Sequence, residues 1–313
     1  MTESAPAPKT AVVLIAHGTV ESLDDLPAFL ANIRRGHPAP PELVAEVRRR
    51  YEAIGGRSPL LDITREVAAK LEARLGLAVR VAMRLFHPYP KDVIVALAAD
   101  GVRRIVAVPL AQHSAAVYGA AMTAAAREVD ATLEVACAPN WGRTPELTRA
   151  FAGAILEALA RVPPGESGGT ALVMTAHSLP VQIVRSGDPY EAEVRGSAED
   201  VAAEVRRRGG AFAEHHVAFQ SQGIGTGMEW LGPDLRSTLE ALSSRGVRHV
   251  VLAPIGFLAD HVEILYDLDI EAKAWGEELG IVLYRSTSLN ASEGLVDALV
   301  TVARRVFAPS GEE

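Results

Sequence analysis

Residues 10–17 read TAVVLIAH and residues 170–177 read TALVMTAH, and this repeated stretch decides the fold. Each copy is a short apolar run rich in branched side chains, which is typical of a strand buried on both faces of a parallel sheet. A second pair, GVRRIVAVPLA from Gly101 and GVRHVVLAPIG from Gly246, repeats in the same order. The sequence therefore predicts two copies of one α/β unit, each with a strand that ends in a histidine.

The rest of the chain alternates apolar strand-like runs with amphipathic helical stretches. This alternation is typical of parallel sheets with right-handed crossovers, so we predict an α/β protein with two Rossmann-like lobes, each a doubly wound parallel sheet. The length of 313 residues fits two domains of about 150 residues. The linker PPGESGG leads us to place one lobe at 1–165 and the other at 166–313. We expect the terminal helix over 292–307 to pack back on the first lobe.

Composition excludes several classes of protein. The net charge of −8 argues against a nucleic-acid partner, which requires a basic face. The single cysteine, Cys137, cannot form a disulfide within the chain or hold an iron–sulfur cluster. No apolar run reaches the length of about 18 residues that spans a bilayer, although peripheral membrane contact stays open. The first ten residues lack the pattern of a signal peptide, so we expect a cytoplasmic protein, and a monomer.

An acid-rich segment, DHVEILYDLDIEAK from Asp260, has no counterpart in the first half. If it is one helix, Glu263, Asp267 and Glu271 stand at i, i+4 and i+8 along one face. Like charges at this spacing destabilise a helix unless water or a cation offsets them. The segment is therefore either a solvated surface stripe or a row that passes a divalent cation or a proton into a cleft.

The repeat places one histidine at the end of each of its two strands. Ligands of open α/β sheets bind beyond the carboxyl ends of the strands, where His17 and His177 are predicted to lie. A histidine at a strand end is also a common structural residue. Beside Glu263, however, His177 has the chemistry of a base or a metal ligand, because a carboxylate raises the basicity of an imidazole.

Several blocks resemble the signature sequences of the ferrochelatase family. They are AHSLP at Ala176–Pro180, SGDPY at Ser186–Tyr190, FQSQ…WLGPDL at Phe219–Leu235, PIGFLADHVEILYDLDIEAK at Pro254–Lys273, IRRGH…RRRYEAIGGRSPL at Ile33–Leu60 and PLAQHS at Pro109–Ser114. The resemblance covers nearly the whole chain in the right order. It implies a chelatase-type fold that binds a porphyrin between two lobes and inserts Fe²⁺ with the release of two protons, in haem biosynthesis. Porphyrin and Fe²⁺ would be the substrates, and no cofactor is expected.

The resemblance also assigns roles to residues. His177 and Glu263 would be the catalytic pair at the centre of the macrocycle, and the division of labour between them stays open. Asp267 and Glu271 would form an outer path for metal or protons. The first lobe would bind the porphyrin. Four of its residues fall on family positions that contact the porphyrin and its propionates, namely Arg34, Arg50, Tyr51 and Ser58. Arginine forks suit carboxylates, although a solvated helix face would explain the same arginines.

Trp230 is either a porphyrin contact or a core residue.

The choice of porphyrin depends on the segment before and within the second predicted helix. The stretch IRRGHPAPPELVAEVRRRYEAIGG at 33–56 is short and basic, and so is more similar to coproporphyrin ferrochelatases than to those with a longer apolar lip. We therefore favour coproporphyrin III, with protoporphyrin IX as the alternative. A chelatase for another pair, such as cobalt and sirohydrochlorin, and a non-catalytic haem carrier are the rival functions.

His17 departs from the pattern. Relatives in the coproporphyrin group often have a tyrosine at this position, which can bind iron on the face opposite the catalytic histidine. We hypothesise that His17 is an axial ligand to the product iron. The alternative is that the position merely tolerates a histidine.

Overall fold

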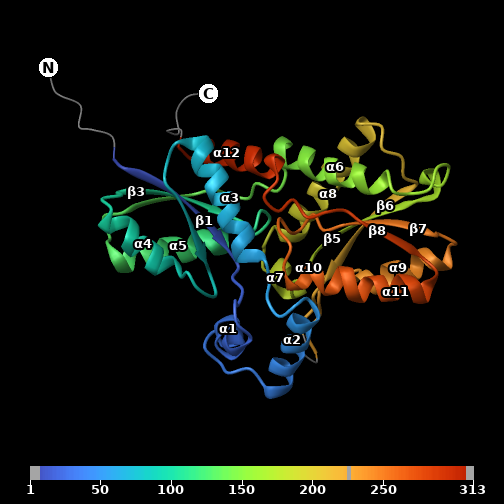
Figure 1. Cartoon of the computed structure of the whole chain (residues 1–313), viewed down its shortest axis with the longest axis horizontal. Coiled ribbons are helices and arrows are strands. Elements are labelled where there is room, and N and C mark those ends of the chain that lie inside the picture. Colours follow the sequence, from blue (N-terminus) through green and yellow to red (C-terminus); the bar gives the residue numbers. More distant parts are fainter. Residues whose placement is uncertain (1–7, 224–226, 308–313) are drawn as a thin grey trace.

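The computed structural model describes residues 8–223 and 227–307, which form two parallel four-stranded sheets. The first has the order β2-β1-β3-β4 and the second the order β6-β5-β7-β8 (Figure 1). The strands are β1 (Thr10–Ala16), β2 (Val79–Met83), β3 (Arg104–Pro109), β4 (Glu134–Cys137), β5 (Ala171–His177), β6 (Glu214–Gln220), β7 (His249–Ala253) and β8 (Val282–Arg285). The predicted pair of α/β units is confirmed, because β1 and β5 hold the same place in equivalent sheets.

Helices connect the strands. They are α1 (Leu26–Ile33), α2 (Pro41–Ala53), α3 (Leu60–Leu75), α4 (Pro90–Ala99), α5 (Ala115–Val129), α6 (Pro145–Leu159), α7 (Val181–Arg185), α8 (Tyr190–Arg207), α9 (Leu235–Ser244), α10 (Val262–Leu265), α11 (Lys273–Leu279) and α12 (Glu293–Phe307). Short 3₁₀ turns occupy Leu23–Asp25 and Ser167–Gly169.

Side chains of β1 alternate between two cores. Val12 and Leu14 belong to a cluster that continues across both lobes, whereas Val13 and Ile15 face a second cluster with α4 and α5. This period of two is what a strand covered on both faces requires. Each sheet is therefore doubly wound, as the apolar runs predicted.

One layer of helices bridges the two sheets. In the order α3, α12, α6 and α8, neighbouring helices pack on one another along the upper side of Figure 1. The C-terminal helix α12 lies against α3 and β3 of the first lobe. Helix α6, within the residues assigned to the first lobe, instead contacts α8 and β7 of the second, because its buried face with Phe151 and Ile155 belongs to the shared core. The two lobes thus exchange a helix.

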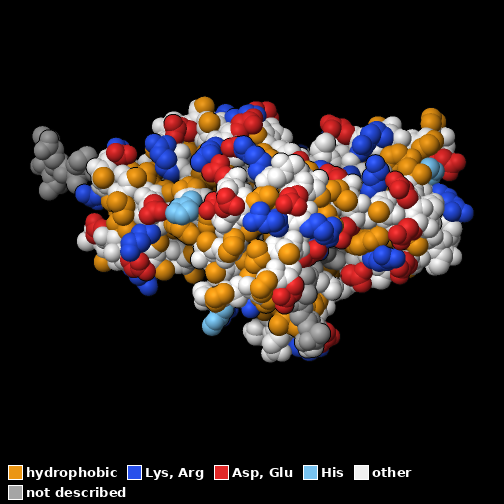
Figure 2. Space-filling model, turned by 60° about the horizontal axis from the view of Figure 1, so that its bottom comes forward, with side chains coloured by type: hydrophobic (Ala, Val, Ile, Leu, Met, Phe, Trp, Pro, Cys, Tyr) orange, Lys and Arg blue, Asp and Glu red, His pale blue; other side chains and the backbone are white. Residues whose placement is uncertain are grey.

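Helices α1 and α2 project from the body on the side opposite this layer (Figure 1). Acidic and basic side chains are interspersed around the projection, and hydrophobic side chains gather where it meets the body (Figure 2). Ile33, at the end of α1, is 42% exposed. No helix in the described residues is long and apolar enough to cross a membrane.

The acidic segment is not the single regular helix that its spacing suggested. It consists of α10, a π-helix at Asp267–Ala272, and α11. The Glu271 amide donates to the carbonyl of Tyr266, five residues back, at 3.0 Å. A period near four residues suits either kind of helix, so the side-chain pattern could not reveal the wider turn.

Candidate active site between the lobes

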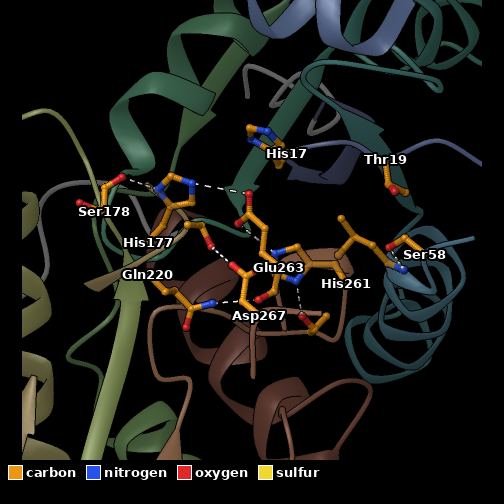
Figure 3. Close-up of polar contacts among 12 residues, drawn as sticks. His17, Thr19, Ser58, His177, Ser178, Gln220, His261, Glu263 and Asp267 are labelled. Carbon is orange, nitrogen blue, oxygen red and sulfur yellow. Dashed lines mark hydrogen bonds and ion pairs between the residues drawn. The ribbon is translucent and has the colours of Figure 1, made fainter. Parts of the chain in front are cut away.

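The carboxyl ends of β1 and β5 open towards one another. His17 directly follows β1, and His177 is the last residue of β5. Figure 3 shows the Glu263 carboxylate between the two histidines, with His17 on the opposite wall. Gly18 helps to form this turn, because its φ of 119° suits glycine and a Cβ there would lie 3.0 Å from the Phe86 amide nitrogen.

His177 and Glu263 form the central polar pair of the site. His177 Nε2 lies 3.6 Å from Glu263 Oε1. The other ring nitrogen, Nδ1, donates to the Ser178 carbonyl at 2.5 Å, and Tyr190 Oη donates to the His177 carbonyl at 2.8 Å. The bond at Nδ1 orients the ring, so that Nε2 is the nitrogen directed at Glu263 and the cleft.

The charges of His177 and Glu263 shift the pKa of each other. Burial in the cleft opposes protonation of His177, but the charge and contact of Glu263, the bond to the Ser178 carbonyl and the charge of Asp267 together outweigh burial and raise the pKa of the imidazole. Burial likewise opposes ionisation of Glu263, yet the contacts with His177 and His261 hold the pKa of this carboxyl well below its usual range. Each group therefore favours the charged form of the other, the imidazolium of His177 and the carboxylate of Glu263.

A close backbone contact places the loop that carries Glu263. The Gly256 amide donates to the Thr175 carbonyl at 2.9 Å, beside the end of β5. A Cβ on Gly256 would lie 2.5 Å from the Ala176 Cβ, so only glycine fits here without a shift. The close contact between Gly256 and the end of β5 brings the following segment, and with it Glu263, near His177.

A second histidine, His261, completes the group. Its Nε2 lies 3.5 Å from Glu263 Oε2, and its Nδ1 is 3.0 Å from the Ala259 carbonyl. The ring also packs on Phe257 with centroids 5.2 Å apart. His261 was not among the residues predicted for the site, although it is a ligand-type residue two positions before Glu263 in the sequence.

Asp267 is buried below Glu263, with 5% exposure. Ser221 Oγ donates to its Oδ2 at 2.5 Å, and Arg50 Nη1 lies 3.3 Å from its Oδ1. Burial, followed by the charges of Glu263 and Glu271, raises the pKa of Asp267 to about 6 in spite of these partners. Asp267 can therefore gain or lose a proton near neutral pH.

The outer end of the acidic row opens into a pocket of about 210 Å³. Asp267, Glu271, Ser221 and Arg50 are among the residues that line it. Within residues 8–223 and 227–307, no three His, Cys, Asp or Glu side chains are grouped so as to hold a metal ion. The structure therefore places Asp267 and Glu271 in one row beside the central pair, rather than in a closed metal cage.

His17 has a different environment from His177. Its Nδ1 lies 3.2 Å from Tyr118 Oη, which leaves Nε2 for a ligand in the cleft. Enclosure by the cleft walls, helped by the positive charge of Arg84, lowers the pKa of His17 to about 4 against the opposing effect of Glu263. The imidazole is thus neutral near pH 7, and in the tautomer in which Nδ1 donates to Tyr118 Oη the lone pair is on Nε2.

Arg84 is a cationic residue of this wall that the sequence did not single out. Its guanidinium carbon lies 5.3 Å from the centre of the Tyr118 ring. Nε is buried without a hydrogen-bond partner, and no carboxylate of the described residues lies within ion-pair distance. The side chain as a whole is only half-buried, and its free Nε–H is a donor that suits an anionic ligand in the cleft.

Two arginines predicted to bind propionates differ in availability. Arg34 caps the end of α1 and is exposed. Arg50 already has two carboxylate partners within the protein, since it bonds to Glu46 at 2.8 Å and contacts Asp267 of the other lobe. Contact of either residue with a substrate stays a prediction.

The other three side chains predicted to contact the porphyrin are buried or half-buried in the protein. Tyr51 is 1% exposed, and its hydroxyl lies 2.9 Å from Thr19 Oγ1. Ser58 is also buried, and its Oγ accepts from the Leu60 amide at the start of α3. Trp230 is half-buried and pairs with Pro180 in a short bridge, and its indole N–H has no partner among the described residues. As placed, the Tyr51 and Ser58 hydroxyls serve protein contacts.

The sequence as a whole matches the family model for ferrochelatase over residues 9–306. The chain belongs to the ferrochelatase family. A ferrochelatase of Herpetosiphon aurantiacus is 36% identical over 304 residues, covering 94% of this chain and 98% of that relative. The coproporphyrin III ferrochelatase of Geobacillus kaustophilus is 35% identical over 317 residues, covering 97% and 98%. As a ferrochelatase, the protein is a metal-inserting enzyme of haem biosynthesis.

Solved structures support the fold. SirB from Bacillus subtilis with Fe³⁺ aligns with a TM-score of 0.59 over 96% of each chain, at 13% identity. CbiX, described as the terminal enzyme for biosynthesis of sirohaem in denitrifying bacteria, aligns with a TM-score of 0.55 over 94% of this chain and 98% of that one. The predicted chelatase-type fold is therefore confirmed.

Proposed function

We propose that the protein inserts Fe²⁺ into coproporphyrin III in the cleft between His17 and Glu263 and releases two protons. The observation that carries the proposal is the coupled pair of His177 and Glu263, which faces a neutral histidine on the opposite wall. A flat ligand in this cleft would meet a base on one side and a potential metal ligand on the other.

Proton transfer is best assigned to His177. A base has to approach the pyrrole N–H to about 3 Å, and it works best when its pKa lies near the operating pH. The raised pKa of His177 makes its neutral form a stronger acceptor than the Glu263 carboxylate, whose pKa is depressed. Glu263 would then keep its charge and attract the incoming cation, with Asp267 and Glu271 behind it.

Coproporphyrin III carries four propionates, and a basic, accessible rim suits them. Relatives of this chain include proteins named coproporphyrin III ferrochelatase at 31–35% identity. The unpaired Arg84 in the first-lobe wall and the exposed Arg34 offer guanidinium groups for carboxylates. Protoporphyrin IX, with two propionates, is the alternative substrate.

The function is tested by anaerobic incubation with Fe²⁺ and each of coproporphyrin III, protoporphyrin IX and sirohydrochlorin. We expect the fluorescence of free coproporphyrin III to be lost at a higher kcat/KM than that of protoporphyrin IX. A higher value for protoporphyrin IX would overturn the substrate assignment. If all three tetrapyrroles keep their fluorescence, iron insertion itself is refuted.

We further propose that Nε2 of His17 binds the product iron from the face opposite His177. The Tyr118 hydroxyl occupies Nδ1 and so fixes which nitrogen faces the cleft. Imidazole is a good ligand for iron when it is neutral, as His17 is near pH 7.

Replacing His17 with alanine is therefore expected to change the absorption spectrum of the bound ferrous product, because an axial nitrogen is lost. The spectrum of the purified product complex measures this. His216→Ala, which removes a histidine outside the cleft that lies 2.7 Å from Glu214, is the matched control. An unchanged spectrum in His17→Ala would exclude axial ligation.

No resident cofactor is part of this proposal. The one cysteine, Cys137, is half-buried and its Sγ contacts the Gly119 carbonyl, and a single thiolate cannot ligate an iron–sulfur cluster. The cytoplasmic location and the monomeric state stay predictions.

A further inference from the structure

Arg285, the last residue of β8, joins two segments on either side of Glu263. Its Nη2 lies 3.1 Å from Asp260 Oδ1, in the loop before α10. Its Nε and Nη2 donate to Asp269, in the π-helix, at 2.5 and 3.0 Å. One guanidinium therefore ties the start of the acidic segment to its π-turn, with Glu263 between the two attachment points.

Asp260 is fixed from several directions. Ser288 Oγ donates to it at 2.7 Å and Asn290 Nδ2 at 2.9 Å, and the Asp260 amide donates to Asn290 Oδ1 at 2.8 Å. The bonds from Asn290 and Ser288, with the charge of Arg285, lower the pKa of Asp260 despite its burial. Asp260 precedes His261 directly, so its attachment also fixes the path of the chain into the site.

The pair of Arg285 with Asp260 is largely shielded from solvent, and the pair with Asp269 is partly exposed. The side chains of Arg285 and Asp260 are each 18% exposed, and that of Asp269 is 38% exposed. Bidentate arginine–carboxylate contacts of this kind constrain geometry as well as adding energy. Removing one partner of a shielded pair leaves a charge without compensation, which shifts the local structure.

The segment needs such support because its backbone is irregular. Helix α10 has only four residues, and the π-helix that follows is a rare form found mostly as single turns at functional sites. Glu263 lies in the first of these pieces and Asp267 begins the second. Their relative position therefore depends on the join between α10 and the π-turn.

We propose that Arg285 is a positioning residue, which clamps Asp260 to Asp269 and thereby holds Glu263 and Asp267 in the register that metal insertion requires. The inference rests on the proposed function, since it assigns Arg285 a role through those carboxylates. Arg285 would act through its bonds to Asp260 and Asp269.

The clamp is tested with Arg285→Met, Arg285→Lys and Asp269→Asn in the iron-insertion assay. We expect Arg285→Met to lower kcat at least tenfold while KM for coproporphyrin III stays within about twofold, because the porphyrin walls are intact. Lysine should restore part of the loss, since it keeps the charge without the fork. Asp269→Asn, which leaves the contact with Asp260, should lower kcat about threefold.

A double-variant cycle separates positioning from general stability. If Arg285 acts through Asp269, adding Asp269→Asn to Arg285→Met should cost less than the single Asp269→Asn does in the wild type. Arg245→Met is the matched control, because Arg245 pairs with Glu214 at 2.7 and 2.8 Å outside the cleft. Its kcat should equal that of the wild type, with melting temperatures recorded for every variant.

The outcomes are distinct. An unchanged kcat in Arg285→Met, additive losses, or an equal loss in Arg245→Met would overturn the clamp. If Arg285→Met does not fold, Arg285→Lys and Asp269→Asn decide, and wild-type kcat in both would overturn it. A wild-type enzyme without turnover would instead refute the proposed function.

Discussion

Replacing His177 with alanine is expected to lower kcat for iron insertion by about 10²- to 10⁴-fold, the usual contribution of a positioned base. The substitution removes the ring that lies 3.6 Å from Glu263, together with its bond to the Ser178 carbonyl, while the bond from Tyr190 Oη to the His177 backbone carbonyl is kept. Porphyrin affinity should stay within about threefold. Stopped-flow turnover measures the first quantity, and quenching of porphyrin fluorescence without iron measures the second.

His216→Ala provides the control for this prediction as well. It removes a histidine of the second lobe that has a carboxylate at 2.7 Å, but lies in β6 away from the cleft. Its kcat should match that of the wild type. A His177→Ala enzyme that keeps more than a tenth of the wild-type kcat would show that another group accepts the pyrrole proton.

The strand ends were predictable from the sequence for a simple physical reason. A buried parallel strand must be apolar on both faces, so its end is marked where the first residue with an ionisable side chain appears. His17 and His177 are those residues, and both lie at the cleft. Glu263 could also be placed near them, because its segment follows the end of β7.

Contacts between distant segments could not be predicted in this way. Arg50 meets Asp267 across 217 positions of sequence, and no local pattern reports that its charge is already paired. The same limit hid Arg84, whose importance lies in having no carboxylate within reach. Helical spacing identified a row of carboxylates, but not the π-turn that carries Asp267.

The return of α12 to the first lobe was expected, but the packing of α6 on the second lobe escaped prediction for a related reason. Helix α6 is amphipathic, and the period of its apolar face shows that it packs but not on which sheet. In the structure α6 joins the second lobe and α12 returns to the first. The two walls of the cleft are therefore held by one continuous core, which keeps His17 and Glu263 facing each other.

Glu263→Gln is expected to move the acidic limb of the kcat/KM profile to lower pH and to reduce the plateau. In the free enzyme His177 must be neutral to accept a proton, so activity falls as pH drops through its pKa. Glu263 is the main group that raises this pKa against the effect of burial. Without the carboxylate, the effect of burial dominates and lowers the pKa of His177. The ring then loses its proton at lower pH, and the acidic limb of the profile moves to lower pH with it.

The plateau should fall at least tenfold, because glutamine cannot supply the negative charge that attracts the cation at the centre of the site. For the position of the acidic limb, Glu271→Gln is the matched control, since Glu271 lies in the outer row and is not among the main groups that shift the pKa of His177. Profiles between about pH 5.5 and 9 at fixed Fe²⁺ measure both effects. If the acidic limb of Glu263→Gln coincides with that of the wild type, the limb does not report His177, and the assignment of the base to this residue falls.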